Sequence, residues 1–130
     1  MIYEDAERII ELTLQTHWTK TPIDFDNVPY ESRRGQAFVR LQIEWYDGES
    51  IGPMRHRYGG YIMLSVFVPG KIGSRLSAQY IDQLQAIFLS LKHEHLQIQP
   101  ARVQRVGDNR EWYQRNLLIP FTYDYCKEVA

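Results

Sequence analysis

The sequence contains little cysteine, no marked excess of one charge and no long apolar run. Its single cysteine, Cys126, excludes an intrachain disulfide bond and agrees with folding in a reducing compartment. A formal net charge of −1 argues against a protein that wraps nucleic acid with a broad basic face. No run of about 18 apolar residues occurs, and the start MIYEDAERII lacks the basic and apolar regions of a signal peptide. We therefore expect neither a membrane span nor a signal peptide.

Known catalytic motifs are missing as well. The sequence has no GxSxG, HExxH, Walker A or dinucleotide-binding motif. The segment Gly70–Ser74 superficially resembles a phosphate loop, but it follows a proline and lacks the full spacing, which favours a strand-to-helix turn. Cys126 with His17 or His56 would form a nucleophile pair, but glycine-rich or oxyanion-type surroundings are lacking.

A metal site is suggested only weakly, by the segment His93–His95. Two histidines one residue apart diverge on a helix, and no further ligands lie nearby as a motif. Such residues are ordinary partners of the dipole at a helix C-terminus. We therefore predict no catalytic residue, no metal and no cofactor, and a protein that is not an enzyme.

What is present is the composition of a single globular domain. The chain has 130 residues, of which 44% are hydrophobic and 24% charged, and these proportions are ordinary for a soluble protein. A chain of this length can bury roughly two-thirds of its unfolded surface. We find no internal repeat and no low-complexity segment, and therefore predict one domain over residues 1–130.

The stretch from Arg55 to Leu91 contains the clearest pattern. Residues 62–68 form an apolar run broken only by a serine, which predicts a central strand. The prolines and glycines of residues 69–73 end this strand, and Ser74 is expected to cap the helix that follows. Apolar residues then recur at helical spacing, namely Leu76, Tyr80, Leu84, Ile87, Phe88 and Leu91.

The flanking segments complete the expected fold. Residues 3–19 read as an amphipathic helix, and residues 37–46 alternate as a strand does. Residues 23–36 are expected to be a long surface connection, and residues 47–57 a flexible arm. Residues 98–106 and 111–126 look like a final hairpin around residues 107–109, in which Pro120 marks an edge or a break. The expected fold class is α+β, a mostly antiparallel, four-stranded (mixed) sheet with two helices packed on one face, in the order α-β-β-α-β-β.

Two further patterns suggest contact with other chains. Tyr61, Met63 and Phe67 alternate with the apolar residues of the opposite face, so the face not covered by helices must be buried by residues 21–36 or by another subunit. Residues 1–50 carry 5 Lys/Arg against 10 Asp/Glu, a net charge of −5, while residues 51–130 carry 10 against 6, a net charge of +4. This split arises either by chance on a solvated surface or in a dipolar subunit that attracts copies of itself head to tail.

Basic residues cluster at Arg33-Arg34 and at Arg55-His56-Arg57. These clusters are either solvated loop charge or contacts to phosphate or to acidic patches on a neighbouring subunit. Aromatic residues do not interleave with them as a base-stacking platform requires, which argues against sequence-specific recognition of nucleic acid.

Several segments together resemble one known family. They are F-D-N-V-P-Y at residues 25–30, G-Q-A-F-V-R-L-Q-I at residues 35–43, R-H-R-Y-G-G-Y-I-M-L-S-V-F-V-P-G-K-I-G at residues 55–73, and S-R-L-S-A-Q-Y-I-D-Q-L at residues 74–84. Over residues 3–91 the chain resembles the tail terminator-like proteins of long-tailed bacteriophages and prophages. By position, the matching residues are Phe25, Asn27, Tyr30, Arg57, Gly60, Pro69 and Gly73.

The resemblance implies a structural role in the virion. Such proteins form a homo-oligomeric ring, commonly a hexamer, which caps the tail tube, stops its polymerisation and offers a surface to neck or head-completion proteins. Genomic DNA would pass through the channel without sequence-specific binding, and the protein would reside at the head-proximal end of the tail after a period in the host cytoplasm. The residues expected at an oligomer or tube interface, or facing the channel, are Arg33, Arg34, Arg55, His56, Arg57, Tyr61, Met63, Phe67, Lys71 and Arg75. The alternatives are another neck or tail-completion protein and a small ligand-binding or enzymatic α+β domain.

Overall fold

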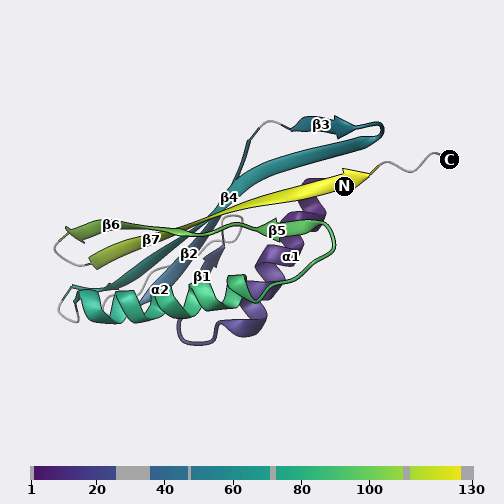
Figure 1. Cartoon of the computed structure of the whole chain (residues 1–130). Helices are drawn as coiled ribbons and strands as arrows, with labels where there is room; N and C mark the ends of the chain where they lie inside the picture. The colour runs from purple at the N-terminus through teal and green to yellow at the C-terminus, as the bar shows by residue number, and fades with distance from the viewer. Residues whose placement is uncertain (1, 26–35, 47, 71–72, 110–111, 127–130) are drawn as a thin grey trace.

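The computed structural model describes residues 2–25, 36–46, 48–70, 73–109 and 112–126. This part of the chain forms two helices and seven strands. In chain order they are α1 (Ile2–His17), β1 (Ile23–Phe25), β2 (Phe38–Trp45), β3 (Glu49–Gly52), β4 (Arg55–Pro69), α2 (Ser74–Leu89), β5 (Leu96–Ile98), β6 (Arg102–Asn109) and β7 (Trp112–Cys126) (Figure 1).

All seven strands belong to one mixed sheet, built around the two longest. β4 and β7 pair antiparallel over their whole length, from Arg55 opposite Cys126 to Pro69 opposite Trp112. On its other side, β4 pairs with β3 near Arg55 and with β2 farther along toward Pro69. On its other side, β7 pairs with β5 near its C-terminal end and with β6 toward Trp112. β1 extends the sheet by pairing parallel with β2. The order is therefore β1-β2-β4-β7-β5, with β3 and β6 attached to the central pair.

The expected four-stranded sheet with the order α-β-β-α-β-β is wrong. The observed order is α-β-β-β-β-α-β-β-β, because β1, β3 and β5 are additional short strands of three or four residues. Strands of that length show no usable alternation in the sequence. β3 lies inside the segment expected to be a flexible arm, and β1 lies at the start of the expected surface connection.

Each helix buries one stripe of its surface. In α1, Ala6, Ile10 and Leu14 are fully buried at a spacing of four residues, and Glu4 and Asp5 lie in the first turn, where the helix dipole favours acids. In α2 the buried residues are Ser77, Ile81, Leu84 and Phe88. These stripes share one core with the helix-facing side of the sheet, which includes Ile62, Leu64, Val66, Leu117 and Ile119. Both helices therefore cover the same face.

The start of α2 differs from the sequence-based expectation. Gly73, with φ 82°, occupies the N-cap position and no side chain caps the helix. Ser74 is the first helical residue, and its carbonyl accepts a hydrogen bond from the hydroxyl of Ser77 at 2.7 Å. The prediction of Ser74 as the cap is therefore wrong. The positive φ at the cap position is a backbone conformation that glycine adopts readily.

Pro120 does not interrupt β7, contrary to expectation. The carbonyl of Pro120 accepts a hydrogen bond from the N–H of Gln99 at 2.8 Å. A strand residue directs its carbonyl and its amide nitrogen to the same side, so the missing N–H of Pro120 also faces Gln99. Gln99 lies between β5 and β6, where the partner of β7 changes. Pro120 therefore lies where the pairing of β7 with β5 and β6 is already interrupted, and a central strand tolerates a proline at such a position.

Neither helix in the described ranges is long and apolar enough to cross a membrane.

Candidate functional site

The sheet has a second face, which points away from both helices and which we call the open face. The register places alternate residues of the strands on this face. They are Arg40, Gln42 and Glu44 of β2, Arg57, Tyr61, Met63 and Phe67 of β4, Gln114, Asn116, Leu118, Pro120 and Asp124 of β7, and Arg102 and Gln104 of β6.

One end of the open face is filled by aromatic side chains of the chain itself. The rings of Phe38 and Phe67 stack with centroids 4.6 Å apart, and the Trp112 ring meets the Phe38 ring edge-on at 5.3 Å. The Arg40 guanidinium lies 5.2 Å from the centre of the Phe67 ring and also donates to the Asp24 carboxylate at 2.8 Å. Such cation–π and aromatic contacts fix these side chains in place. Phe67 therefore already has intramolecular partners.

The middle of the open face is hollowed into a groove of about 570 Å³. It is lined by Tyr46, Tyr61, Met63, Arg102, Gln104, Leu118 and Pro120, which we call the open-face groove. Its floor comes from β4 and β7 and is largely apolar, while β6 supplies the polar border. Tyr46 at the rim is 58% exposed, and its ring centre lies 5.9 Å from that of Tyr61. Within the described part of the chain, Arg102 has no ion-pair partner.

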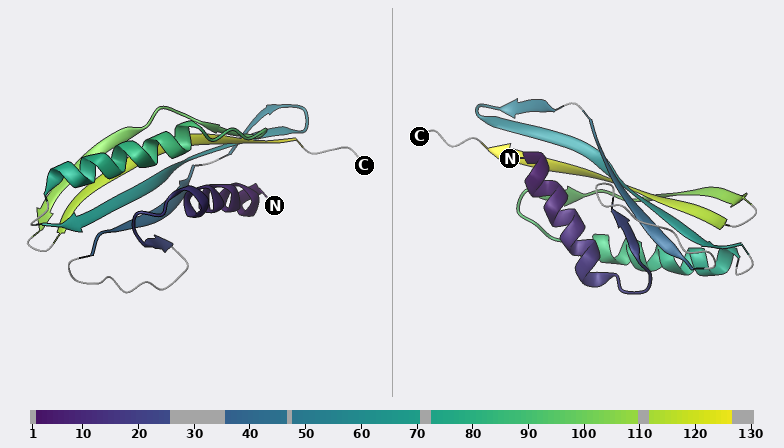
Figure 2. Two further views of the ribbon diagram at one scale, coloured as in Figure 1. Left: turned by 90° about the horizontal axis from the view of Figure 1, so that it is seen from below. Right: turned by 180° about the vertical axis from the view of Figure 1, so that it is seen from behind.

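The other end of the sheet extends into a hairpin formed by β3 and the start of β4, residues 49–57, which we call the arm. Glu49 pairs with Arg57 and Ser50 with His56, and the register shifts at the tip. The arm stands clear of both helices (Figures 1 and 2). Ile51 and Met54 lie near its tip and are 39% and 41% exposed. The segment expected to be a flexible arm is thus a hydrogen-bonded hairpin.

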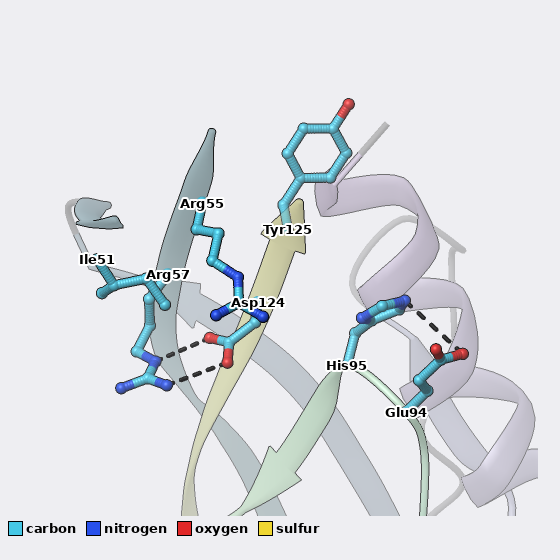
Figure 3. A pocket seen from close by; sticks show the side chains of 7 residues that line it. All are labelled: Ile51, Arg55, Arg57, Glu94, His95, Asp124 and Tyr125. Atoms are coloured by element: carbon cyan, nitrogen blue, oxygen red, sulfur yellow. Dashed lines mark hydrogen bonds and ion pairs between the residues drawn. The ribbon is translucent and has the colours of Figure 1, made fainter. Parts of the chain in front are cut away.

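An ion pair ties the base of the arm to β7. Arg57 donates to both oxygens of the Asp124 carboxylate, at 2.8 Å from Nε and 3.0 Å from Nη2. This bidentate hydrogen bonding holds the pKa of Asp124 below its ordinary value and raises the pKa of Arg57. The positive charge of Arg55, whose guanidinium points toward the same carboxylate in Figure 3, lowers the Asp124 pKa further.

A small pocket of about 340 Å³ surrounds this ion pair (Figure 3). Its lining residues are Ile51, Arg55, Arg57, Glu94, His95, Asp124 and Tyr125. Within the described residues, Arg57 is bound to Asp124 and His95 lies 3.9 Å from Glu94, whereas Arg55 has no ion-pair partner there. The ion pair between Arg57 and Asp124 therefore fixes the base of the arm against β7.

The far end of β7 carries a cluster of arginines that the sequence analysis did not single out. The guanidiniums of Arg105 and Arg115 lie 5.8 and 5.7 Å from the centre of the Tyr113 ring. Arg115 also donates a hydrogen bond to the Tyr113 hydroxyl at 3.2 Å, which lowers the pKa of Tyr113. These residues come together because β6 pairs with β7, with Arg105 directly opposite Arg115. Such a pairing cannot be read from spacing along the chain.

The structure distributes the predicted interface residues over separate places. Tyr61 and Met63 lie together in the open-face groove, and Phe67 lies in the aromatic cluster. Arg55, His56 and Arg57 form the base of the arm. Arg57 and Phe67 are separated by about 33 Å of continuous strand, at about 3.3 Å per residue.

Arg75 is exposed in the first turn of α2, away from the arm. Arg33, Arg34 and Lys71 lie outside the described residues, as do Asn27 and Tyr30 of the loop that carries part of the family resemblance.

Candidate ligands for a metal ion do not gather in the described part of the chain, where no group of three or more His, Cys, Asp or Glu side chains could hold one. The His93 and His95 rings lie 6.0 Å apart, and His93 Nδ1 accepts a hydrogen bond from the backbone N–H of His95 at 3.2 Å. This bond engages one ring nitrogen of His93 in the local turn. The side chain of Cys126 lies outside the described residues.

Comparison with known proteins supports the fold alone. No family model matches the sequence, and no curated protein resembles it significantly. Among solved structures, one chain superposes with a TM-score of 0.66, covering 94% of this chain and 98% of that chain at 16% sequence identity. At this identity the similarity concerns the arrangement of helices and strands. The chain therefore adopts, over nearly its whole length, a fold that a protein of solved structure shares.

Proposed function

We propose that this protein is a structural subunit of the tail terminator type, which assembles with copies of itself into a ring on the end of a bacteriophage tail tube. The ring caps the tube, stops the addition of further tube subunits and presents its outer surface to neck or head-completion proteins. DNA passes through the channel of the ring without sequence-specific binding. The observation that carries the proposal is the open face, because its groove has an apolar floor that neither helix covers.

The apolar floor of this groove is unfavourable to leave in water. Tyr61, Met63 and Leu118 are apolar or aromatic and remain partly exposed on the central strands β4 and β7. Covering apolar surface stabilises a complex by about 25 cal/mol per Å². An open apolar face of this kind is typical of a protein that associates with other proteins.

The distribution of charge supports a head-to-tail association. The acidic first part of the chain supplies β1, β2 and β3 on one side of the central pair. The other side carries β5 and β6, and Arg102 and Arg105 are exposed on β6. Opposite charges on opposite sides of a subunit attract the unlike sides of neighbouring copies. Contacts between unlike surfaces close into a ring when the rotation between subunits permits it.

A tube polymerisation assay tests the proposal. Purified tail-tube subunits from the same genome are allowed to polymerise with and without this protein, and tube lengths are measured by electron microscopy. We expect shorter tubes that stop growing, with a ring of extra density at one end. Binding to tubes without an effect on length would instead assign a neck or tail-completion role. If the protein stays monomeric and does not bind the tubes, the proposal is wrong.

A further inference from the structure

The tip of the arm exposes parts of two apolar side chains. Ile51 and Met54 are 39% and 41% exposed on a hairpin that stands clear of both helices. Met54 also has a φ of 60°, which is uncommon for a residue other than glycine. The turn thus holds a long apolar side chain outward, in a position where glycine would form the same turn more readily.

The open-face groove has the opposite property, since it is a hollow of about 570 Å³ with an apolar floor. A groove of this size takes a few side chains of the length of isoleucine and methionine. Its rim is accessible, because Tyr46 is 58% exposed. The shapes of the arm and the groove are therefore complementary, one protruding and one hollow.

The arm cannot enter the groove of its own chain. Met54 precedes the first residue of β4, and Met63 lies in the middle of the same strand. About 30 Å of continuous extended strand separates the two, at about 3.3 Å per residue. β4 is paired with β7 along its whole length, so it cannot fold back on itself. An arm that fills the groove therefore comes from another molecule.

We propose that the arm of one subunit docks in the open-face groove of the next, with Ile51 and Met54 against the apolar floor. The charges agree with this arrangement. Glu49 is exposed on the arm, and Arg102 is exposed at the border of the groove without an ion-pair partner in the described ranges. Docking brings an exposed acid toward an exposed base at the edge of the contact. Every copy carries both surfaces, so a second copy is the occupant that satisfies both at once.

The contact deepens the proposed function and rests on it. Because the arm and the groove are different surfaces, each subunit uses its arm on one neighbour and offers its groove to the other. The geometry therefore specifies a directional chain of subunits, which closes into a ring where the rotation between neighbours permits it. The arm, residues 49–57, is the part of the subunit that sets the direction.

The test uses one variant of each surface, changed only at exposed positions so that the fold is retained. The arm variant carries Ile51→Asp and Met54→Asp, and the groove variant carries Tyr46→Asp and Arg102→Glu. Circular dichroism and thermal unfolding establish that each variant folds as the wild type does. We expect self-association, measured by sedimentation velocity over a range of concentrations, to weaken about tenfold or more in each variant.

Mixing the two variants gives the decisive result. Each pair retains one intact groove, from the arm variant, and one intact arm, from the groove variant. An equimolar mixture should form a one-to-one dimer of twice the subunit mass that does not grow further with concentration. As a control, Leu89→Asp changes a residue that is 58% exposed on α2 and should leave association unchanged.

Two results overturn the inference. One is normal assembly of either variant, and the other is a mixture that stays monomeric although the wild type associates. The tube assay separates this failure from failure of the proposed function. If the arm variant still assembles and shortens tubes, the docking contact is wrong and the tail terminator role stands. If the wild type neither assembles nor affects tubes, the role itself is wrong.

Discussion

Replacing Gly60 by alanine tests the packing between β2 and β4 most directly. Gly60 is buried and lies opposite Trp45 in the pair that β4 forms with β2. A Cβ atom added at this position would overlap the carbonyl oxygen of Glu44 and would lie 3.2 Å from Cζ of Phe121. A backbone atom of a neighbouring strand cannot rotate away as a side chain can, so β2 and β4 would have to separate locally.

The expected effect follows from two opposing terms. Gly→Ala in an extended conformation that alanine accepts stabilises a protein by about 0.4–1 kcal/mol through the unfolded chain. Overpacking in a well-packed core costs about 1–3 kcal/mol, and a collision with backbone belongs at the upper end of that range. We therefore expect Gly60→Ala to lower the free energy of unfolding by about 2 kcal/mol.

Gly59→Ala is the matched control, one residue away on the same strand. There the added Cβ would lie 3.6 Å from the Phe121 carbonyl oxygen and 3.7 Å from Cδ2 of Tyr46, which are ordinary contacts. Urea unfolding followed by circular dichroism measures both variants, and an unchanged slope shows that only stability has changed. The reasoning is refuted if Gly60→Ala is as stable as the wild type, or if Gly59→Ala is destabilised equally.

Three further predictions concern single side chains. Phe88→Ala removes a fully buried ring and should lower the free energy of unfolding, measured with urea, by about 3–5 kcal/mol. The control Leu89→Ala, at a position that is 58% exposed, should change the free energy of unfolding by less than about 0.5 kcal/mol. The pKa of Asp124 is lowered in the folded state from an ordinary value of 3.8. Its carboxylate therefore adds stability above that pH, and this contribution is lost as the pH falls from about 3.8 through the folded-state pKa. Asp124→Asn should accordingly show a smaller loss of stability than the wild type when thermal unfolding is compared at pH 6 and in acid, whereas equal losses would contradict the ion pair. The lowered pKa of Tyr113 should return toward its ordinary value in Arg115→Gln, as followed by NMR titration of the ring, and an unmoved titration would contradict the hydrogen bond between the two side chains.

Long periodic segments could be read from the sequence because burial follows local spacing. In β2, Val39, Leu41 and Ile43 face the helices and Arg40 and Glu44 face away, as their alternation predicts. In β7, the buried residues Leu117, Ile119 and Phe121 alternate in the same way. In each case a residue's neighbours along the chain fix which face it occupies.

The short strands could not be read in this way. Leu96 and Ile98 of β5 are in a strand only because they pair with Tyr123 and Phe121, which lie far along the chain. Pro120 has a similar explanation, because its missing N–H matters only in relation to the interval between β5 and β6. Partners distant in sequence decide such positions, and local propensity does not report on them.

The candidate site was predicted only in part for the same reason. Tyr61 and Met63 were identified by alternation along β4. Arg102, Leu118 and Pro120 join them only through the pairing of β7 with both β4 and β6. Because the groove is formed by residues of three strands, the sequence of no single strand predicts it.

The pairing of β4 with β7 has a mechanical consequence for the arm. The arm grows directly out of β4, so a pull on its tip runs along the strand axis into the longest ladder of the sheet. Force applied in that direction shears many hydrogen bonds simultaneously, whereas force applied across the strands would peel them apart one after another. A subunit held by its arm would therefore carry the load through the pairing of β4 with β7 and extend little under it.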